Sequence, residues 1–165
     1  TALEKFINKY KDEDFVIEGL RFIEPRVKNF IFTKEGIFID MGLEKRIPIN
    51  VMGDGIRKIV SLLTVIYDCK DGIVLIDEIS NGFHYSVMSN LWNVIIKAAI
   101  KNNTQLFITT HDYDSVKGLR DTALGEFDEQ VATFKLLRTP DDELKALHYS
   151  LESVDYSINQ EIEIR

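Results

Sequence analysis

The pattern of apolar and polar residues divides the chain into helical and extended segments. Up to about Leu20, apolar residues recur at the i, i+3, i+4 and i+7 positions that predict an amphipathic helix. Residues 27–50 show short β-rich runs separated by KEG and GLEK, a pattern typical of antiparallel hairpins. The next segment, which begins GDGIRKI at Gly53, returns to helical spacing, and we expect a buried helix with a glycine-rich start.

The middle of the chain predicts a parallel β-sheet. Four consecutive apolar residues at 73–76 are typical of a strand that is covered on both faces. A helix is expected from about Ser86 to Lys101, followed by a second apolar strand in the sequence QLFITTHD. Strand, helix, strand and helix between 72 and 120 form a βαβ unit, so the predicted fold class is α/β.

The segments on either side of this unit are predicted to be hairpins. We therefore expect a single domain with a helical and hairpin lead-in at 1–50, a central region at 51–120, and a hairpin with a C-terminal tail at 121–165.

Composition and charge exclude some classes of function but do not identify one. The chain has 165 residues and a formal net charge of −7, which argues against coating nucleic acid or an anionic membrane by bulk charge. No apolar run approaches the roughly 18 residues that span a bilayer, and the start of the sequence lacks the apolar region of a signal peptide. The single cysteine, Cys69, cannot form an internal disulfide. We expect a cytoplasmic protein.

Polar groups follow both predicted parallel strands. Asp77 and Glu78 come directly after the first strand, and His111 follows the second. Because ligands of open α/β sheets bind beyond the carboxyl ends of the strands, these three side chains are candidates for one site. One carboxylate can hold a divalent cation, the next can polarise a water molecule, and a histidine can stabilise charge on a phosphate. The alternative is a solvated turn on one strand and a helix cap on the other.

The start of the preceding helix is a second candidate. Gly53 and Gly55 allow close approach to the backbone, and the N–H groups of a helix N-terminus attract anions. Asp54 and Arg57 lie beside them. An ordinary turn is the alternative, because Asp-Gly pairs favour turns.

Taken in order, GDGIRKI, GIVLIDE and FITTHD resemble the second half of an ABC-type ATPase head. The sequence is most similar to the stand-alone AAA/ABC-like ATPases of prokaryotes, which are related to the OLD and SMC-type heads, and the resemblance is strongest over 50–116. It implies a partial P-loop NTPase fold of three layers. Asp77 would be the Walker B aspartate on Mg²⁺, Glu78 the general base, and His111 the switch histidine. Residues 52–56 would stand in the place of the signature motif.

The sequence also departs from that family. Gly53 stands where transporter heads carry a serine, so a phosphate would depend on backbone N–H groups and Arg57. No G-x-x-x-x-G-K-[ST] run occurs, although that motif cradles the phosphates. The resemblance therefore implies that this chain is one half of an ATPase. It would need an N-terminal P-loop half, or a separate P-loop chain, to use ATP and Mg²⁺. The resemblance further implies a homodimer of the complete protein and, as possible partners, DNA or an effector nuclease.

Two other functions remain open on the sequence. Asp112 and Asp114, with Glu78, could form a metal-dependent nuclease site of Toprim type. The chain could also be a non-catalytic dimerisation or regulatory module. If the ATPase interpretation holds, nothing in this chain can deliver a phosphate to Gly53 and Gly55. Both glycines should then lie exposed and away from the acidic cluster.

Overall fold

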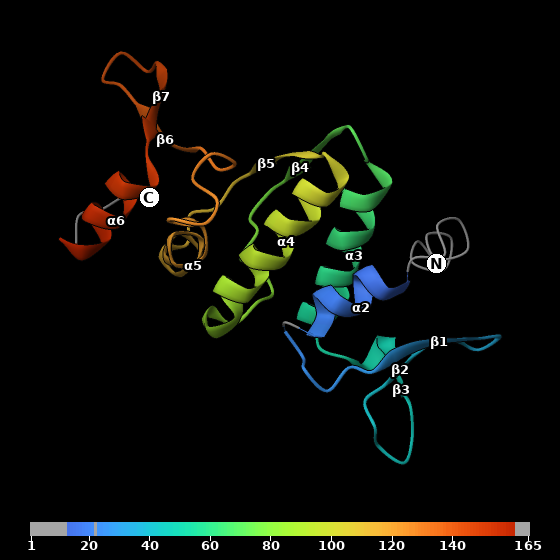
Figure 1. The fold of residues 1–165 in the computed structure, drawn as a ribbon. Coiled ribbons are helices and arrows are strands. Elements are labelled where there is room, and N and C mark those ends of the chain that lie inside the picture. Colours follow the sequence, from blue (N-terminus) through green and yellow to red (C-terminus); the bar gives the residue numbers. More distant parts are fainter. Residues whose placement is uncertain (1–12, 22, 161–165) are drawn as a thin grey trace.

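The computed structural model describes residues 13–21 and 23–160 and shows a mixed α/β fold (Figure 1). Its N-terminal part contains helix α2, a three-stranded antiparallel sheet and one 3₁₀ turn: α2 (Glu13–Arg21), β1 (Asn29–Thr33), β2 (Gly36–Asp40), β3 (Ile47–Pro48) and η1 (Ile49–Val51). The predicted hairpin is confirmed, because Thr33 pairs with Gly36 across the turn. The first turns of the predicted N-terminal helix lie outside the described residues.

The central βαβ unit is confirmed. It contains α3 (Asp54–Asp68), β4 (Ile73–Ile76), η2 (Tyr85–Val87), α4 (Met88–Asn102), β5 (Gln105–Ile108) and α5 (Tyr113–Ala123). β4 and β5 pair in parallel, with Ile73 opposite Gln105 and Ile76 opposite Ile108. This register brings the carboxyl ends of both strands to the same edge.

The hydrophobic core lies among α2, α3 and α4 on one side of the β4–β5 sheet. Leu63 of α3 and Leu91 and Ile95 of α4 are fully buried in it. Helix α5 packs closely on α4 at Gly118, where an added Cβ would lie 2.8 Å from the Cβ of Met88. This close approach fixes α5, and with it the segment that follows β5.

The prediction that β4 is covered on both faces is wrong for the described residues. Val74 and Ile76 are buried, but Ile73 and Leu75 are 60% and 78% exposed. Phe107 of β5 is also exposed on this sheet. The apolar run is continuous because both faces carry apolar side chains, while the helices of the described chain cover only one of them.

The C-terminal part holds a hairpin of β6 (Thr133–Arg138) and β7 (Leu144–Tyr149), followed by α6 (Leu151–Asn159). Arg120 of α5 donates a hydrogen bond of 2.5 Å to Asp155 of α6, which joins this part to the centre. No helix within residues 13–21 and 23–160 is both long and apolar enough to cross a membrane.

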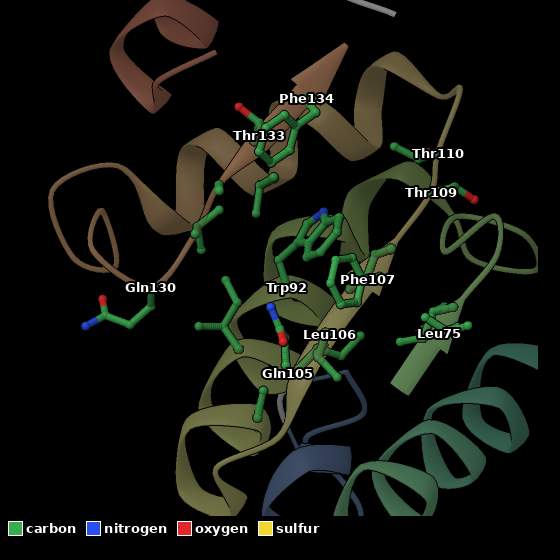
Figure 2. A pocket seen from close by; sticks show the side chains of 18 of the residues that line it. Leu75, Trp92, Gln105, Leu106, Phe107, Thr109, Thr110, Gln130, Thr133 and Phe134 are labelled. Carbon is green, nitrogen blue, oxygen red and sulfur yellow. The ribbon is translucent and has the colours of Figure 1, made fainter. Parts of the chain in front are cut away.

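An open groove of about 1450 Å³ lies between β5 and β6. Figure 2 shows Phe107 and Thr133 on its walls, with Trp92 of α4 between them. Trp92 is fixed there because its indole Nε1 donates to the carbonyl of Ser115 at 2.8 Å. In the described part of the chain, β5 pairs only with β4 and β6 only with β7. The groove therefore separates two strands that each have one unpaired edge.

Candidate functional site

Glu78 and His111 meet at the ends of the two strands, as the sequence predicts. The parallel register places Asp77 and Thr109 directly beyond the paired residues Ile76 and Ile108. Nδ1 of His111 lies 2.7 Å from Oε1 of Glu78, although 33 positions separate the two residues. The structure thus brings Glu78 and His111 into direct contact at the carboxyl edge of the sheet.

Thr109 connects the two strand ends, a role that the sequence did not reveal. Its hydroxyl donates to Oδ1 of Asp77 at 2.5 Å and accepts the N–H of Glu78 at 3.0 Å. The carbonyl of Thr109 also accepts the N–H of Ile79 at 3.1 Å. The sequence contains one hint of this role. Thr109 is the first polar residue after the second strand, as Asp77 is after the first, so the two face each other when the strands pair in parallel. Thr109 therefore fixes the Asp77 side chain and the Glu78 backbone together.

Glu78 is held in an uncommon backbone conformation. Its φ of 51° lies in the left-handed region, which costs a non-glycine residue roughly 1–2 kcal/mol. Its side chain is 28% exposed, and Oε2 is buried with no hydrogen-bond partner among the described residues. Strain and an unsatisfied buried acceptor are both common at functional sites. One oxygen of the Glu78 carboxylate therefore lacks a hydrogen-bond partner and is shielded from solvent in the described part of the chain.

Lys58 of α3 is the second residue that the sequence did not reveal. Its ammonium donates to three carbonyl oxygens of residues 77–84, which we call the acidic loop: those of Glu78 at 3.3 Å, Ile79 at 3.2 Å and Asn81 at 2.6 Å. It also lies 5.3 Å from the centre of the Phe83 ring. Burial lowers the pKa of the Lys58 ammonium, and the negative charge of Glu78 partly offsets this effect.

The two glycines at the start of α3 differ in their surroundings. Gly53 is the N-cap residue of α3, is exposed, and an added Cβ would meet no atom within 4 Å. Gly55 is half-buried, and a Cβ there would lie 3.4 Å from the Phe83 ring and 3.5 Å from the carbonyl of Gly82. The expectation of exposure is therefore confirmed for Gly53 and wrong for Gly55, because Gly55 packs against the acidic loop.

The charged residues beside these glycines bind each other. Arg57 forms an ion pair with Asp54 one turn earlier on α3, and the two side chains are 50% and 78% exposed. This contact holds the guanidinium close to the N-terminus of α3. An anion that approached there would meet Arg57 together with the exposed N–H groups of the first turn.

Asp112 has a structural role in this chain. Its carboxylate caps α5 by accepting the N–H of Asp114 at 3.1 Å. Among residues 13–21 and 23–160, no group of three or more histidine, cysteine and acidic side chains could hold a metal ion. The capping alternative therefore accounts for Asp112, and the nuclease alternative gains no support from the geometry.

Comparison with known proteins identifies the family. Residues 1–116 match the family described as "AAA domain, putative AbiEii toxin, Type IV TA system", which is well over half of the chain. The chain belongs to this family. An ATP/GTP phosphatase of Helicobacter pylori is 27% identical over 124 residues. That match includes 72% of this chain but only 33% of the relative, so the chain spans a third of the relative's length.

Solved structures confirm the fold of this AAA-domain chain. A chain from a study of ATP-driven dimerization and DNA stimulated activation of SMC ATPases superposes with a TM-score of 0.61 at 15% identity, over 99% of both chains. An SMC head bound to the C-winged helix domain of ScpA superposes with a TM-score of 0.59 at 16% identity, over 87% of this chain and 44% of that one. The predicted P-loop NTPase fold is thereby confirmed.

Proposed function

We propose that this chain supplies the signature and Walker B part of an ATP-hydrolysing site, which a P-loop half outside the sequence completes. The observation that carries the proposal is the contact between Glu78 and His111 at the ends of two parallel strands, with Oε2 of Glu78 buried and without a partner. Membership of an AAA-domain family supports the same function.

Glu78 is the proposed general base. Its Oε1 lies 2.7 Å from His111 and the side chain is 28% exposed, so this carboxylate can polarise a water molecule that binds at the sheet edge for attack on a phosphate. The hydrogen bond from the N–H of Glu78 to the Thr109 hydroxyl fixes the backbone that carries this carboxylate. His111 is 79% exposed, so it can reach both Glu78 and a phosphate that arrives from outside the chain.

Asp77 is the proposed magnesium ligand. Carboxylate oxygens are the ligands that Mg²⁺ prefers, and the lack of a hydrogen-bond partner for Oε2 of the neighbouring Glu78 among the described residues supports a cation or its water at this edge. When bound, the ion supplies positive charge that neutralises the phosphates. Thr109 fixes Oδ1 of Asp77 and thereby orients the carboxylate.

Removing this ligand should change the metal requirement. In the complete protein, we expect Asp77→Ala to raise the Mg²⁺ concentration for half-maximal hydrolysis by about tenfold or more, which corresponds to the loss of one metal-directed carboxylate. A magnesium titration of ATPase activity measures this shift. An unchanged half-maximal concentration would remove Asp77 from the role.

The P-loop half is the proposed occupant of the groove between β5 and β6. Both strands have an unpaired edge there among the described residues, and the exposed apolar side chains of Leu75 and Phe107 need a cover. The match covers only 33% of the Helicobacter pylori relative, so about two thirds of that protein lies outside the match and is long enough to contain a P-loop half. The third layer of the predicted fold would then come from that half.

This arrangement predicts poor nucleotide binding by the present chain alone. We expect a dissociation constant for ATP weaker than about 0.1 mM, because the phosphate cradle is absent from the sequence. Calorimetry with ATP and Mg²⁺ on the chain alone and on the protein with its P-loop half tests this. Micromolar binding by the chain alone would contradict the half-site proposal. Failure of the completed protein to bind ATP would favour the non-catalytic module.

The exposed start of α3 is the proposed contact to a second copy. Gly53 and Arg57 would meet the phosphates of ATP held by the other subunit, as the resemblance to ABC-type heads implies. The SMC ATPase study that includes a similar fold concerns ATP-driven dimerization and DNA stimulation. We therefore propose a homodimer of the complete protein, with DNA or an effector nuclease as the partner that it serves.

A further inference from the structure

Lys58 joins two parts of the proposed site that come from separate segments of the chain. It lies on α3, five positions after Gly53, and its ammonium contacts the carbonyls of Glu78, Ile79 and Asn81. A lysine ammonium has three donors, and here three carbonyl oxygens receive them. This degree of engagement is unusual for a long cationic side chain, which ordinarily keeps its head in water.

The acidic loop forms two backbone hydrogen bonds of its own, from the N–H of Asn81 to the carbonyl of Glu78 and from the N–H of Phe83 to the carbonyl of Ser80, both at 3.1 Å, and Lys58 adds bonds from a separate helix. Glu78 and Gly82 both have positive φ, at 51° and 81°, so the backbone is neither helical nor extended. Thr109 binds the N–H of Glu78, and Lys58 binds the carbonyl of the same residue. The two peptide groups that flank the Glu78 side chain are therefore held by side chains from two different elements.

We propose that Lys58 is a positioning residue that fixes the backbone of Glu78 and links it to the start of α3. The inference rests on the proposed role of Glu78 as the base and goes beyond it by assigning Lys58 to the same reaction. Contact between Gly55 and Phe83, the ring beneath the Lys58 ammonium, provides a second connection between the same two segments. A phosphate that moves the N-terminus of α3 would thus also move the carboxylate.

The test replaces Lys58 in the complete protein with its P-loop half. Lys58→Met keeps the apolar stem and removes all three donors, so kcat for ATP hydrolysis should fall by about tenfold or more, as expected for a misplaced catalytic group. KM for ATP should stay within about twofold, because the phosphate cradle is untouched. Lys58→Arg keeps the charge and the donors, and it should recover at least part of the lost kcat.

Two measurements separate positioning from a general loss of structure. Lys70→Met removes an exposed lysine beyond the other end of α3 and should leave kcat unchanged. Amide hydrogen exchange in residues 78–83 should become faster in Lys58→Met, while exchange in α4 stays the same. If Lys58→Met does not fold, Lys58→Gln takes its place, since its amide keeps two donors.

The outcomes are distinguishable. If the unmodified protein hydrolyses ATP and Lys58→Met keeps its kcat, the positioning role is overturned and the proposed function stands. Equal losses of kcat in Lys58→Met and Lys58→Arg with unchanged exchange in the loop would also overturn it. If the completed, unmodified protein hydrolyses no ATP, the proposed function fails, and the role of Lys58 fails with it.

Discussion

Glu78→Gln in the complete protein should lower ATP hydrolysis by roughly 10²–10⁴-fold, the usual contribution of a positioned general base. The amide has the shape of the carboxylate and can still accept a hydrogen bond from His111, but it cannot take a proton from water. The structure adds a reason for a large effect, because Oε2 is buried without a partner and Glu78 has a left-handed φ of 51°. ATP binding should change little, since Glu78 does not hold the nucleotide in this proposal.

Steady-state hydrolysis and calorimetric ATP binding measure the two parts of this expectation. Glu129→Gln is a matched control, because Glu129 is exposed and lies outside the site. It should keep normal turnover. Turnover in Glu78→Gln equal to that of the unmodified protein would remove Glu78 from the role of base, and a large loss of ATP binding would show that Glu78 acts in the ground state instead.

The contact at the centre of the site could be predicted from the sequence because it follows from topology. Two apolar strands separated by one helix pair in parallel, and polar residues after each strand then meet at one edge. Glu78 and His111 illustrate this directly, since the prediction needed only the order of the elements and the identity of the residues after them. Their chemical roles stay proposals.

The roles of Lys58 and Thr109 could not be predicted because they depend largely on contacts with backbone groups of a distant segment. Contacts such as that of the Lys58 ammonium with three carbonyls leave no side-chain pattern in the sequence. The half-burial of Gly55 was missed for a related reason, because it depends on how the acidic loop folds back toward α3. Asp112, by contrast, took the capping role that a short acidic residue before a helix favours.

The exposed face of β4 shows why a strand can be predicted correctly while the burial predicted for its side chains is wrong. Leu75 is 78% exposed, although its apolar neighbours on both sides predicted a covered strand. An apolar residue in a strand indicates that its face of the sheet is covered in the functional protein. The residues that cover it can belong to another segment or another chain. The exposed apolar residues are therefore consistent with the proposal of a P-loop half. In that proposal the half would cover Leu75 and Phe107 along the groove shown in Figure 2.

Gly53→Glu should strongly weaken ATP-driven dimerisation of the complete protein without unfolding it. A carboxylate at the N-cap of α3 would face the phosphates of the other subunit, and a like-charge contact across an interface costs several kcal/mol, so we expect the dimer to weaken by about a hundredfold or more. Gly53 is the better position for this test than Gly55, because its φ of −54° suits any residue and a Cβ meets no atom within 4 Å. Gly55→Glu should act in the same direction, but it also presses on Phe83.

Gly53→Gln is the matched control, since it has nearly the same size as Gly53→Glu and carries no charge. Sedimentation velocity with ATP and Mg²⁺, in a Glu78→Gln background that prevents hydrolysis, would measure the dimer in both variants. Equal melting temperatures of the two variants would show that the fold is intact, because the open space around Gly53 accepts either side chain. A dimer that forms equally well in Gly53→Glu and Gly53→Gln would refute the contact in trans. Loss of the dimer in both variants would point to crowding of the α3 N-terminus and would refute the electrostatic reason given for it.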